Sequence, residues 1–266
     1  MVLKNGQYLG YERLKRSLAF YELSLHHYAE NEQLPMHAHE NSYISLSLNG
    51  IYQESSNNGL RHDELVVDPK VLLYRPSGYK HANVFDKKGG SCFNIEFRDL
   101  NQLSGFYAKT EEVSVLQNNI GMTKVINGFV CGYEDDVMQL LIEEAMVSVD
   151  QQDTARRKSK VVRRSIELLE EEYCSNLSLT YLSQKLNVHP VYLARKFKAE
   201  MHLTIGEYLR QVRLRKAFYL LRDTDKKLTE IAYDTGFYDQ AHFSRNFKNT
   251  FDLLPSHIKE NLSRLT

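Results

Sequence analysis

Short runs in which apolar and polar residues alternate characterise residues 34–97. In residues 43–48, for example, Ile44, Leu46 and Leu48 are separated by serines. A period of two places successive side chains on opposite faces of a strand, so the pattern predicts β-structure. Glycine, asparagine and proline interrupt the runs at residues 49–50, 57–59, 76–78 and 89–90, as expected for turns. We therefore predict an all-β barrel or sandwich, whose inward-facing side chains could line a ligand cavity.

The pattern becomes helical after about residue 99. Apolar residues recur at helical spacing in residues 137–149, and three acidic residues precede them, where the helix dipole favours negative charge. This apolar stripe either packs on the barrel or pairs with a second subunit. The next segment has no large apolar side chain and suits a linker. The predicted organisation is a barrel domain at 1–100, a helical dimerisation or packing segment at 101–150, a linker at 151–159 and an all-helical domain at 160–266.

The all-helical domain contains a short helix, a tight turn and a basic second helix. Residues 180–186 form the short helix and residues 190–200 the second one, in which Leu193 and Phe197 point inward. Pro190 suits the first turn of this helix, where its missing N–H does no harm. This arrangement is a helix-turn-helix, a motif whose second helix typically enters the DNA major groove.

The same arrangement returns about fifty residues later. A second short helix is predicted at residues 228–235, and Gly236 suits the left-handed position that ends it. Asp239 can cap the next helix, in which Phe243 and Phe247 repeat the inward pair. A duplicated motif is far harder to obtain by chance than a single copy. The side chains predicted to face outward from the two second helices are Val191, Ala194, Arg195, Lys198, Gln240, Ala241, Ser244, Arg245 and Lys248.

The charge is distributed unevenly along the chain, although its formal sum is zero. Residues 157–266 hold 20 Lys and Arg against 13 Asp and Glu, a net charge of +7, and the remainder carries −7. A basic domain joined to an acidic one is the asymmetry expected when one half binds a polyanion. Double-stranded DNA is the partner that this charge and the duplicated motif together predict.

Three segments of the second motif resemble the signature of the AraC/XylS family of transcription regulators. They are residues 231–237 (Ile-Ala-Tyr-Asp-Thr-Gly-Phe), residues 243–248 (Phe-Ser-Arg-Asn-Phe-Lys) and Pro255, and the resemblance covers roughly the last 105 residues. The chain departs from the family pattern at Asp252, where glycine is common, and at Ile258 and Lys259, where tyrosine and arginine are usual. These departures lie beyond the second helix of the second motif; the second helix of each motif is called its reading helix.

The resemblance implies a transcription regulator, more often an activator, that contacts RNA polymerase and forms a homodimer. It also implies that the two reading helices enter successive major grooves, joined by a long middle helix. Arg195 and Arg245 stand where family members commonly reach DNA, and an arginine there takes guanine bidentately or clamps a phosphate. Gln240 suits adenine, Val191 and Ala194 suit a thymine methyl, and Ser244 suits either kind of contact.

Histidines in the barrel segment resemble the two motifs of cupin barrels, which commonly form the sensor half of this family. His37 and His39 match the first motif and His81 matches the second, while Tyr43 stands where metal-binding cupins have glutamate. We predict a pocket for a small-molecule effector, lined by His37, His39, Tyr43, Tyr74 and His81, without a metal cofactor. The alternative is a metal-dependent cupin enzyme or metal sensor tethered to DNA, with His37, His39 and His81 as ligands.

Other classes of function find no support in the sequence. There is no glycine-rich phosphate cradle, nucleophile elbow or convincing carboxylate pair, so we expect a protein that is not an enzyme. No apolar segment is long enough to span a membrane, and a cytoplasmic protein is expected. The three isolated cysteines suggest buried reduced thiols rather than disulfides. The predicted fold is mixed α and β, with an N-terminal cupin-like β-barrel and an all-α C-terminal domain holding two helix-turn-helix motifs.

Overall fold

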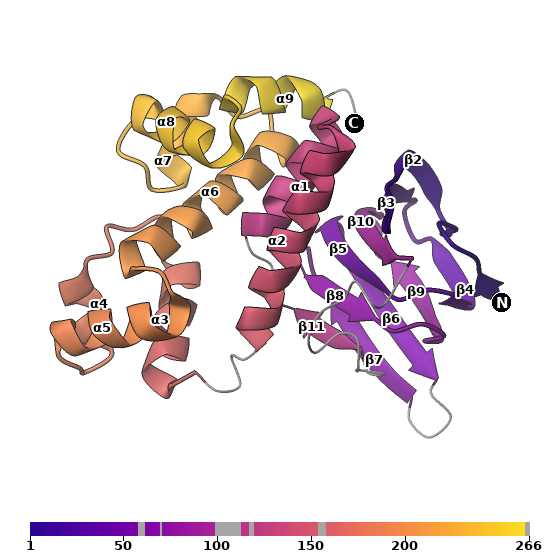
Figure 1. The fold of residues 1–266 in the computed structure, drawn as a ribbon, viewed down its shortest axis with the longest axis horizontal. Coiled ribbons are helices and arrows are strands. Elements are labelled where there is room, and N and C mark those ends of the chain that lie inside the picture. The colour runs from indigo at the N-terminus through magenta and orange to yellow at the C-terminus, as the bar shows by residue number, and fades with distance from the viewer. Residues whose placement is uncertain (58–61, 70, 99–112, 117–119, 154–157, 264–266) are drawn as a thin grey trace. The chain divides into compact units, whose positions relative to one another are not determined.

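A computed structural model of the chain describes residues 1–57, 62–69, 71–98, 113–116, 120–153 and 158–263. The chain forms two units (Figure 1). Unit 1 comprises Met1–Asn118 and Glu134–Asp153, and unit 2 comprises Asn119–Tyr133 and Thr154–Thr266. Unit 1 is built mainly of strands and unit 2 of helices, so the predicted mixed fold is confirmed.

The strands of unit 1 form two sheets. Their bounds are β1 Val2–Leu3, β2 Tyr11–Ser17, β3 Tyr21–Tyr28, β4 Gln33–His39, β5 Tyr43–Asn49, β6 Tyr52–Asn57, β7 His62–Val67, β8 Leu72–Arg75, β9 His81–Phe85, β10 Gly90–Phe97 and β11 Ser114–Leu116. One sheet has the order β1-β4-β9-β6-β7 and the other β11-β8-β5-β10-β3-β2. Nearly all neighbours are antiparallel, with β1 parallel to β4. The predicted barrel is therefore made of two facing sheets.

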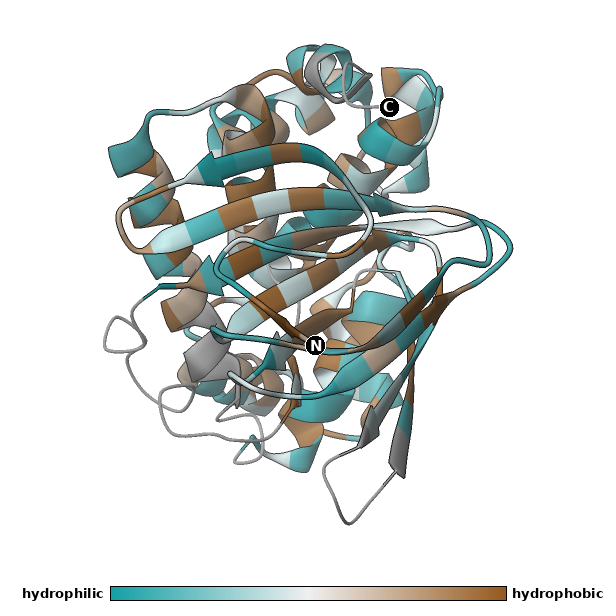
Figure 2. Cartoon of the chain, turned by 90° about the vertical axis from the view of Figure 1, so that its right-hand side faces the viewer, coloured by the Kyte–Doolittle hydropathy of each residue, from teal (hydrophilic) through white to brown (hydrophobic). Residues whose placement is uncertain are grey.

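The four inner strands of the larger sheet, β8, β5, β10 and β3, are buried on both faces, whereas the edge strand β2 is largely exposed. Figure 2 shows apolar and polar residues alternating along the strands, as the period of two requires. One face of the central strands is apolar and the other polar, with Ser24, Ser45 and Asn94 in register across β3, β5 and β10. Helix α2, Asp135–Asp153, belongs to the same unit and buries Met138 and Ile142 completely. The polar face is thus left for the barrel interior.

Unit 2 contains two hydrophobic cores joined by a long helix. Its helices are α1 Ile120–Cys131, α3 Lys160–Glu171, α4 Leu179–Lys185, α5 Pro190–Met201, α6 Ile205–Asp223, α7 Leu228–Asp234, α8 Gln240–Phe251 and α9 Pro255–Ser263. The first core packs α3, α4 and α5 against the start of α6 through residues such as Leu169 and Phe197. The second surrounds Phe218 near the end of α6, whose ring lies 5.7 Å from that of Phe251. Each core supports one helix-turn-helix motif.

Helix α1 is an addition to the second core that the sequence analysis did not anticipate. Met122, Val125 and Phe129 of α1 are buried, and the helix packs against α6 and α9. The hydroxyl of Tyr133 donates to the carbonyl of Phe251 at 3.1 Å. The segment predicted at 101–150 is thereby divided, α1 with unit 2 and α2 with unit 1, while residues 101–112 lie outside the described residues. Helix α2 continues to Asp153, inside the predicted linker, and 154–157 are also outside the described residues.

The departures from the family pattern near the C-terminus are accommodated. Asp252 has a φ of 58°, a left-handed conformation that glycine adopts most easily. Ile258 is fully buried, and Lys259 Nζ donates to the carbonyl of Lys226 at 2.7 Å. The terminal helix α9 therefore forms without the usual residues.

Two expectations about composition can be compared with the described residues. None of their helices combines the length and apolar character that crossing a membrane requires. None of the three cysteines forms a disulfide, and Cys92 is buried as expected, whereas Cys131 is only half-buried. The expectation of burial is wrong for Cys174, which is exposed because it lies in the turn that follows α3.

Candidate nucleic-acid interface and barrel cavity

The two helix-turn-helix motifs repeat each other in backbone conformation. The turn after α4 places Asn187 at a φ of 52°, and the turn after α7 places Gly236 at 78°. In both turns the following residue donates its N–H to a carbonyl of the preceding helix, at 3.0 Å and 2.9 Å respectively. These bonds satisfy carbonyls that a helix end leaves free and redirect the chain in the same way twice.

Buried side chains hold the second helix of each motif at the same rotation. Leu193 and Phe197 of α5 and Phe243 and Phe247 of α8 are all fully buried, as predicted. Asp239 caps α8 by accepting a hydrogen bond from the His242 N–H at 2.6 Å, which confirms the predicted cap. The opposite face of each helix is consequently directed to solvent.

The residues predicted to contact DNA lie on these solvent-directed faces. Two guanidinium groups, those of Arg195 and Arg245, are exposed, and within the described part of the chain neither is paired with a carboxylate. Lys196, by contrast, pairs with Glu200 at 2.8 Å. Ala194 and Ser244 are half-buried, and the other predicted positions are exposed: Val191, Lys198, Gln240, Ala241 and Lys248.

Two arginines on the polar side of α6 instead make hydrogen bonds within unit 2. Arg213 Nε donates to the Tyr173 carbonyl at 2.8 Å. Arg215 Nη2 donates to the Glu170 carboxylate at 2.6 Å, and this guanidinium is largely buried. Arg210 remains exposed. Part of the +7 charge is thus used to hold α3 and the turn after it against α6.

Exposed tyrosines beside the reading helices are the residues that sequence reasoning missed. Tyr238 and Tyr233 are 93% and 82% exposed, and Tyr192 on α5 is 50% exposed. Tyr192 and Arg195 also line a shallow hollow of about 620 Å³ on α5. Tyrosine hydroxyls bond readily to phosphate oxygens. The sequence did offer a signal for these tyrosines, because they lie outside the buried positions that the two motifs repeat.

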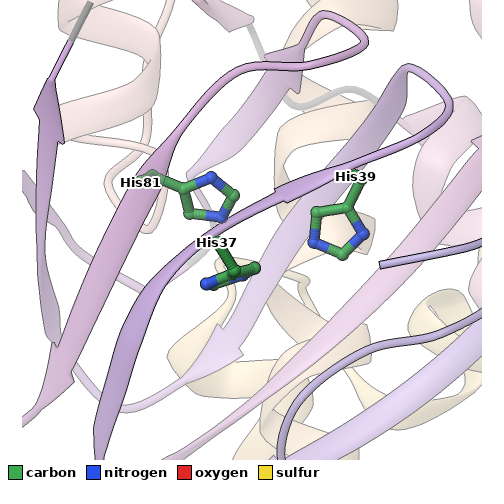
Figure 3. Close-up of side chains that lie close together, drawn as sticks. All are labelled: His37, His39 and His81. Carbon is green, nitrogen blue, oxygen red and sulfur yellow. The ribbon is translucent and has the colours of Figure 1, made fainter. Parts of the chain in front are cut away.

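Three histidines meet in the interior of the barrel in unit 1 (Figure 3). His37 and His39 come from β4 and His81 from β9, and the antiparallel pairing of these strands sets His37 opposite His81. Each is 2% or 3% exposed, and one nitrogen from each ring lies within 4.8 Å of the others. The structure therefore brings together the three predicted histidines.

Hydrogen bonds orient two of these rings. Nδ1 of His37 donates to the Pro35 carbonyl at 2.8 Å, and Nδ1 of His81 donates to the Tyr79 carbonyl at 3.2 Å. With Nδ1 protonated, Nε2 of each neutral ring carries a lone pair. Nε2 of His81 accepts a bond from the Tyr43 hydroxyl at 3.2 Å. Nδ1 of His39 is buried and has no partner among the described residues.

Burial keeps the imidazoles neutral. Desolvation lowers the pKa of His39 to about 2, and the neighbouring histidines add to this effect. Desolvation also lowers the pKa of His37 and, more strongly, that of His81. Neutral imidazoles present nitrogen lone pairs, which suits them to accept hydrogen bonds or to bind a metal.

A buried ion pair lies beside the histidines. Arg75 and Glu54 are 2% and 1% exposed, and Arg75 Nε donates to Glu54 Oε2 at 3.1 Å. Asn83 donates to the same oxygen at 3.0 Å, and Arg75 Nη2 donates to the Tyr52 hydroxyl at 2.9 Å. Burial opposes the charge of the guanidinium, but the carboxylate outweighs it, so the pKa of Arg75 is raised. Nη1 of Arg75 has no partner among the described residues.

The cavity between these groups is small. It offers about 30 Å³ to water-sized molecules and is lined by His37, His39, Tyr43, His81 and Arg75, among others. Tyr74, the fifth predicted pocket residue, is not part of the lining. In β8 it pairs in register with Ile44, whereas the next residue, Arg75, pairs with Tyr43 and shares its inward face. The strand alternation therefore directs Tyr74 away from the cavity, where its hydroxyl donates to Ser42 at 3.4 Å.

Comparisons with known proteins agree with the duplicated motif. A family model described as a helix-turn-helix domain matches residues 182–261. The Msm operon regulatory protein of Streptococcus mutans is 30% identical over 187 residues, which cover 70% of this chain and 66% of that protein. Regulatory protein SoxS of Salmonella typhimurium is 35% identical over 103 residues, 39% of this chain and 96% of SoxS.

A third relative is the HTH-type transcriptional activator RhaS of Citrobacter koseri. It is 36% identical over 92 residues, which cover 35% of this chain and 33% of RhaS. The relatives differ in how much of their own length is matched. The chain belongs to the AraC/XylS family of DNA-binding transcription regulators.

Proposed function

We propose that this regulator recognises a specific operator by placing α5 and α8 in two successive major grooves, and that its barrel senses an effector. The observation that carries the proposal is the duplication, in which both reading helices have the same buried pair and an exposed arginine that pairs with no carboxylate of the described residues. Arg195 and Arg245 contact guanine edges or phosphates, and Gln240, Ser244 and the apolar positions add base contacts.

The length of α6 supports this mode of binding. It has 19 residues, and at about 1.5 Å per residue it spans about 28 Å. Successive major grooves on one side of B-DNA are separated by about 34 Å. A helix of this length, with a helix-turn-helix motif packed at either end, is the right size to connect two reading helices. The exposed Lys198 and Lys248 and the exposed tyrosines supply phosphate contacts in this arrangement.

The regulatory half of the proposal concerns unit 1. A ligand in the barrel changes DNA binding only if it has different affinities for two states of the protein. The buried polar groups around the cavity favour such a ligand, because some of them have no partner among the described residues. The relative RhaS is named a transcriptional activator, and we propose that this chain likewise activates transcription in the cytoplasm through contact with RNA polymerase.

Homodimerisation through α2 completes the proposal. Val137, Leu140 and Val147 are 43%, 65% and 49% exposed, although the other side of α2 is buried. Their spacings of three and seven residues match a helix pair that packs along a narrow apolar seam. Analytical ultracentrifugation is expected to give a dimer for the wild type and a monomer for Leu140→Glu combined with Val147→Glu. Val66→Glu, a matched change at another exposed valine, is expected to leave the dimer intact.

Operator recognition is tested with a DNA site selected from random duplexes by the wild-type chain. Arg195→Ala and Arg245→Ala are each expected to lose about 1–3 kcal/mol of binding free energy, or roughly 5- to 150-fold in affinity. Arg164→Ala is the control, because Arg164 is exposed on α3 and pairs within that helix with Glu167. Wild-type affinity in both α5 and α8 variants, measured at one fixed salt concentration, would contradict the proposed docking.

A further inference from the structure

We propose that the barrel cavity binds a divalent transition metal ion through His37, His39 and His81. The inference deepens the proposed function by naming the chemical class of the sensed ligand, and its regulatory consequence rests on that function. Metal binding itself is independent of DNA and can be measured alone. The metal-free interpretation of these histidines, predicted from the sequence, becomes the alternative that the experiment tests.

The separation of the rings fits a metal centre. Zinc–nitrogen bonds of about 2.0–2.1 Å in a tetrahedral site place three imidazole centroids about 5 Å apart. The centroids here are separated by 4.3 Å for His37 and His81, 5.3 Å for His37 and His39, and 5.8 Å for His39 and His81. The nitrogens lie within 4.8 Å of one another, and they must move closer together to share one ion.

The hydrogen bonds around two of the three rings, those of His37 and His81, are those of metal ligands. A histidine that binds a metal almost always donates its other ring N–H to a carboxylate, a carbonyl or water, which fixes the tautomer and the ring orientation. His37 and His81 each donate Nδ1–H to a backbone carbonyl. Their Nε2 atoms are thereby left as donors of lone pairs. At His81 a metal ion would replace the Tyr43 hydroxyl as the partner of Nε2.

The size of the cavity selects a small ligand. A space of about 30 Å³ accommodates one or two water molecules, and an ion with a bound water needs no more. A sugar or an aromatic effector would require the barrel to open. The space is therefore matched to an ion rather than to a larger organic molecule.

The chemistry of the donors points to zinc or a similar ion. Three neutral imidazoles suit zinc, iron, copper or nickel better than magnesium or calcium, which prefer oxygen ligands. Tyr43 occupies the place of a fourth protein ligand, and burial raises the pKa of its hydroxyl, so it stays protonated. The nearest buried charges, Arg75 and Glu54, neutralise each other. A bound ion would keep an open position for water or a small anion.

Metal binding is measured on the full chain after treatment with a chelator. Co²⁺ is expected to bind at one equivalent per chain with the visible absorption of a four-coordinate centre, and Zn²⁺ is expected to displace it. His37→Ala and His39→Ala are each expected to weaken Zn²⁺ binding by more than about 100-fold, beyond the roughly 10- to 100-fold effect of losing an outer partner. His26→Ala is the control, since it also removes a buried barrel imidazole.

Tyr43→Phe provides a test that keeps all three ligands. Because the hydroxyl competes for His81 Nε2, its loss is expected to tighten metal binding by about 2- to 10-fold, the value of one ordinary hydrogen bond. Weaker binding by this variant would overturn the assignment of Nε2 as the ligand atom. Circular dichroism of each variant establishes that the fold is kept.

The inference is overturned if the wild type shows no saturable one-to-one binding at micromolar metal, or if His26→Ala loses as much affinity as His37→Ala. Binding to the selected DNA site is then measured with chelator and with Zn²⁺. If the chain binds the DNA site but binds no metal, the proposed function is supported and this inference is wrong. A loaded metal site together with a change in DNA affinity would support both.

Discussion

The turn of the second helix-turn-helix motif offers the sharpest test of how local geometry supports the reading helices. Gly236 adopts a φ of 78°, and a Cβ at this position would lie 2.9 Å from the Cys174 carbonyl oxygen. The same Cβ would lie 3.0 Å from Nε and Cζ of Arg213. The substitution Gly236→Ala therefore combines an unfavourable backbone conformation with a collision against backbone.

The magnitude follows from these two effects. A left-handed conformation costs a residue with a Cβ about 1–2 kcal/mol. Arg213 donates to the carbonyls of Tyr173 and Ser175 at 2.8 Å and 2.9 Å. Displacing its guanidinium weakens two hydrogen bonds worth about 1 kcal/mol each. Together these terms predict a loss of about 3 kcal/mol in the free energy of unfolding of unit 2.

Urea unfolding followed by circular dichroism at the helical band measures this loss, because the helices lie mostly in unit 2. Asn187→Ala is the matched control, since Asn187 holds the equivalent position of the first motif with a φ of 52° and is exposed. It is expected to cost about 1 kcal/mol from the backbone alone. An effect of Gly236→Ala no larger than that of Asn187→Ala would refute the collision.

Three further outcomes are expected. Glu54→Gln leaves the Arg75 guanidinium buried without its counter-charge and should lower the free energy of unfolding of unit 1 by about 3–5 kcal/mol, measured by urea unfolding followed in the tyrosine near-ultraviolet signal. Burial, aided by the charge of Lys15, lowers the pKa of His26 from 6.5 to about 4. Because the unfolded chain binds this proton more readily, the free energy of unfolding should fall as the pH is lowered from about 6.5 to about 4, by up to about 1.4 kcal/mol per pH unit. His26→Gln should reduce that slope in chelator-treated protein, and an unchanged slope would contradict the assignment. Asp239→Ala removes the cap of α8 and should cost about 1 kcal/mol, whereas an unchanged midpoint of helical unfolding would show that the cap is dispensable.

Local patterns in the sequence predicted the elements and most of the solvent-directed positions on α5 and α8. The inward pairs Leu193 and Phe197 and their repeat in α8 are buried, and Asp239 and Gly236 take the cap and turn positions expected of them. These features depend on residues within one turn of helix or one tight turn. Residue type and spacing are sufficient to specify them.

Contacts between distant segments decided the rest. A periodic apolar stripe shows that a helix has a buried side but not which body covers it, and α1 and α2 join different units for that reason. Arg215 looks like a surface cation in the sequence, and only its distance to Glu170, 45 positions away, shows that it is used inside unit 2.

The barrel site shows the same division. The resemblance to the two cupin motifs singled out His37, His39 and His81 in the sequence. Whether Tyr74 or Arg75 lines the cavity is decided by the register of β8 against β5. The sequence around these residues cannot reveal that register, because it depends on how the two strands pair. The sequence alone therefore determined the two reading helices and the histidine trio, whereas the small cavity, its buried ion pair and the separation of the rings arose only when the strands were closed into a barrel.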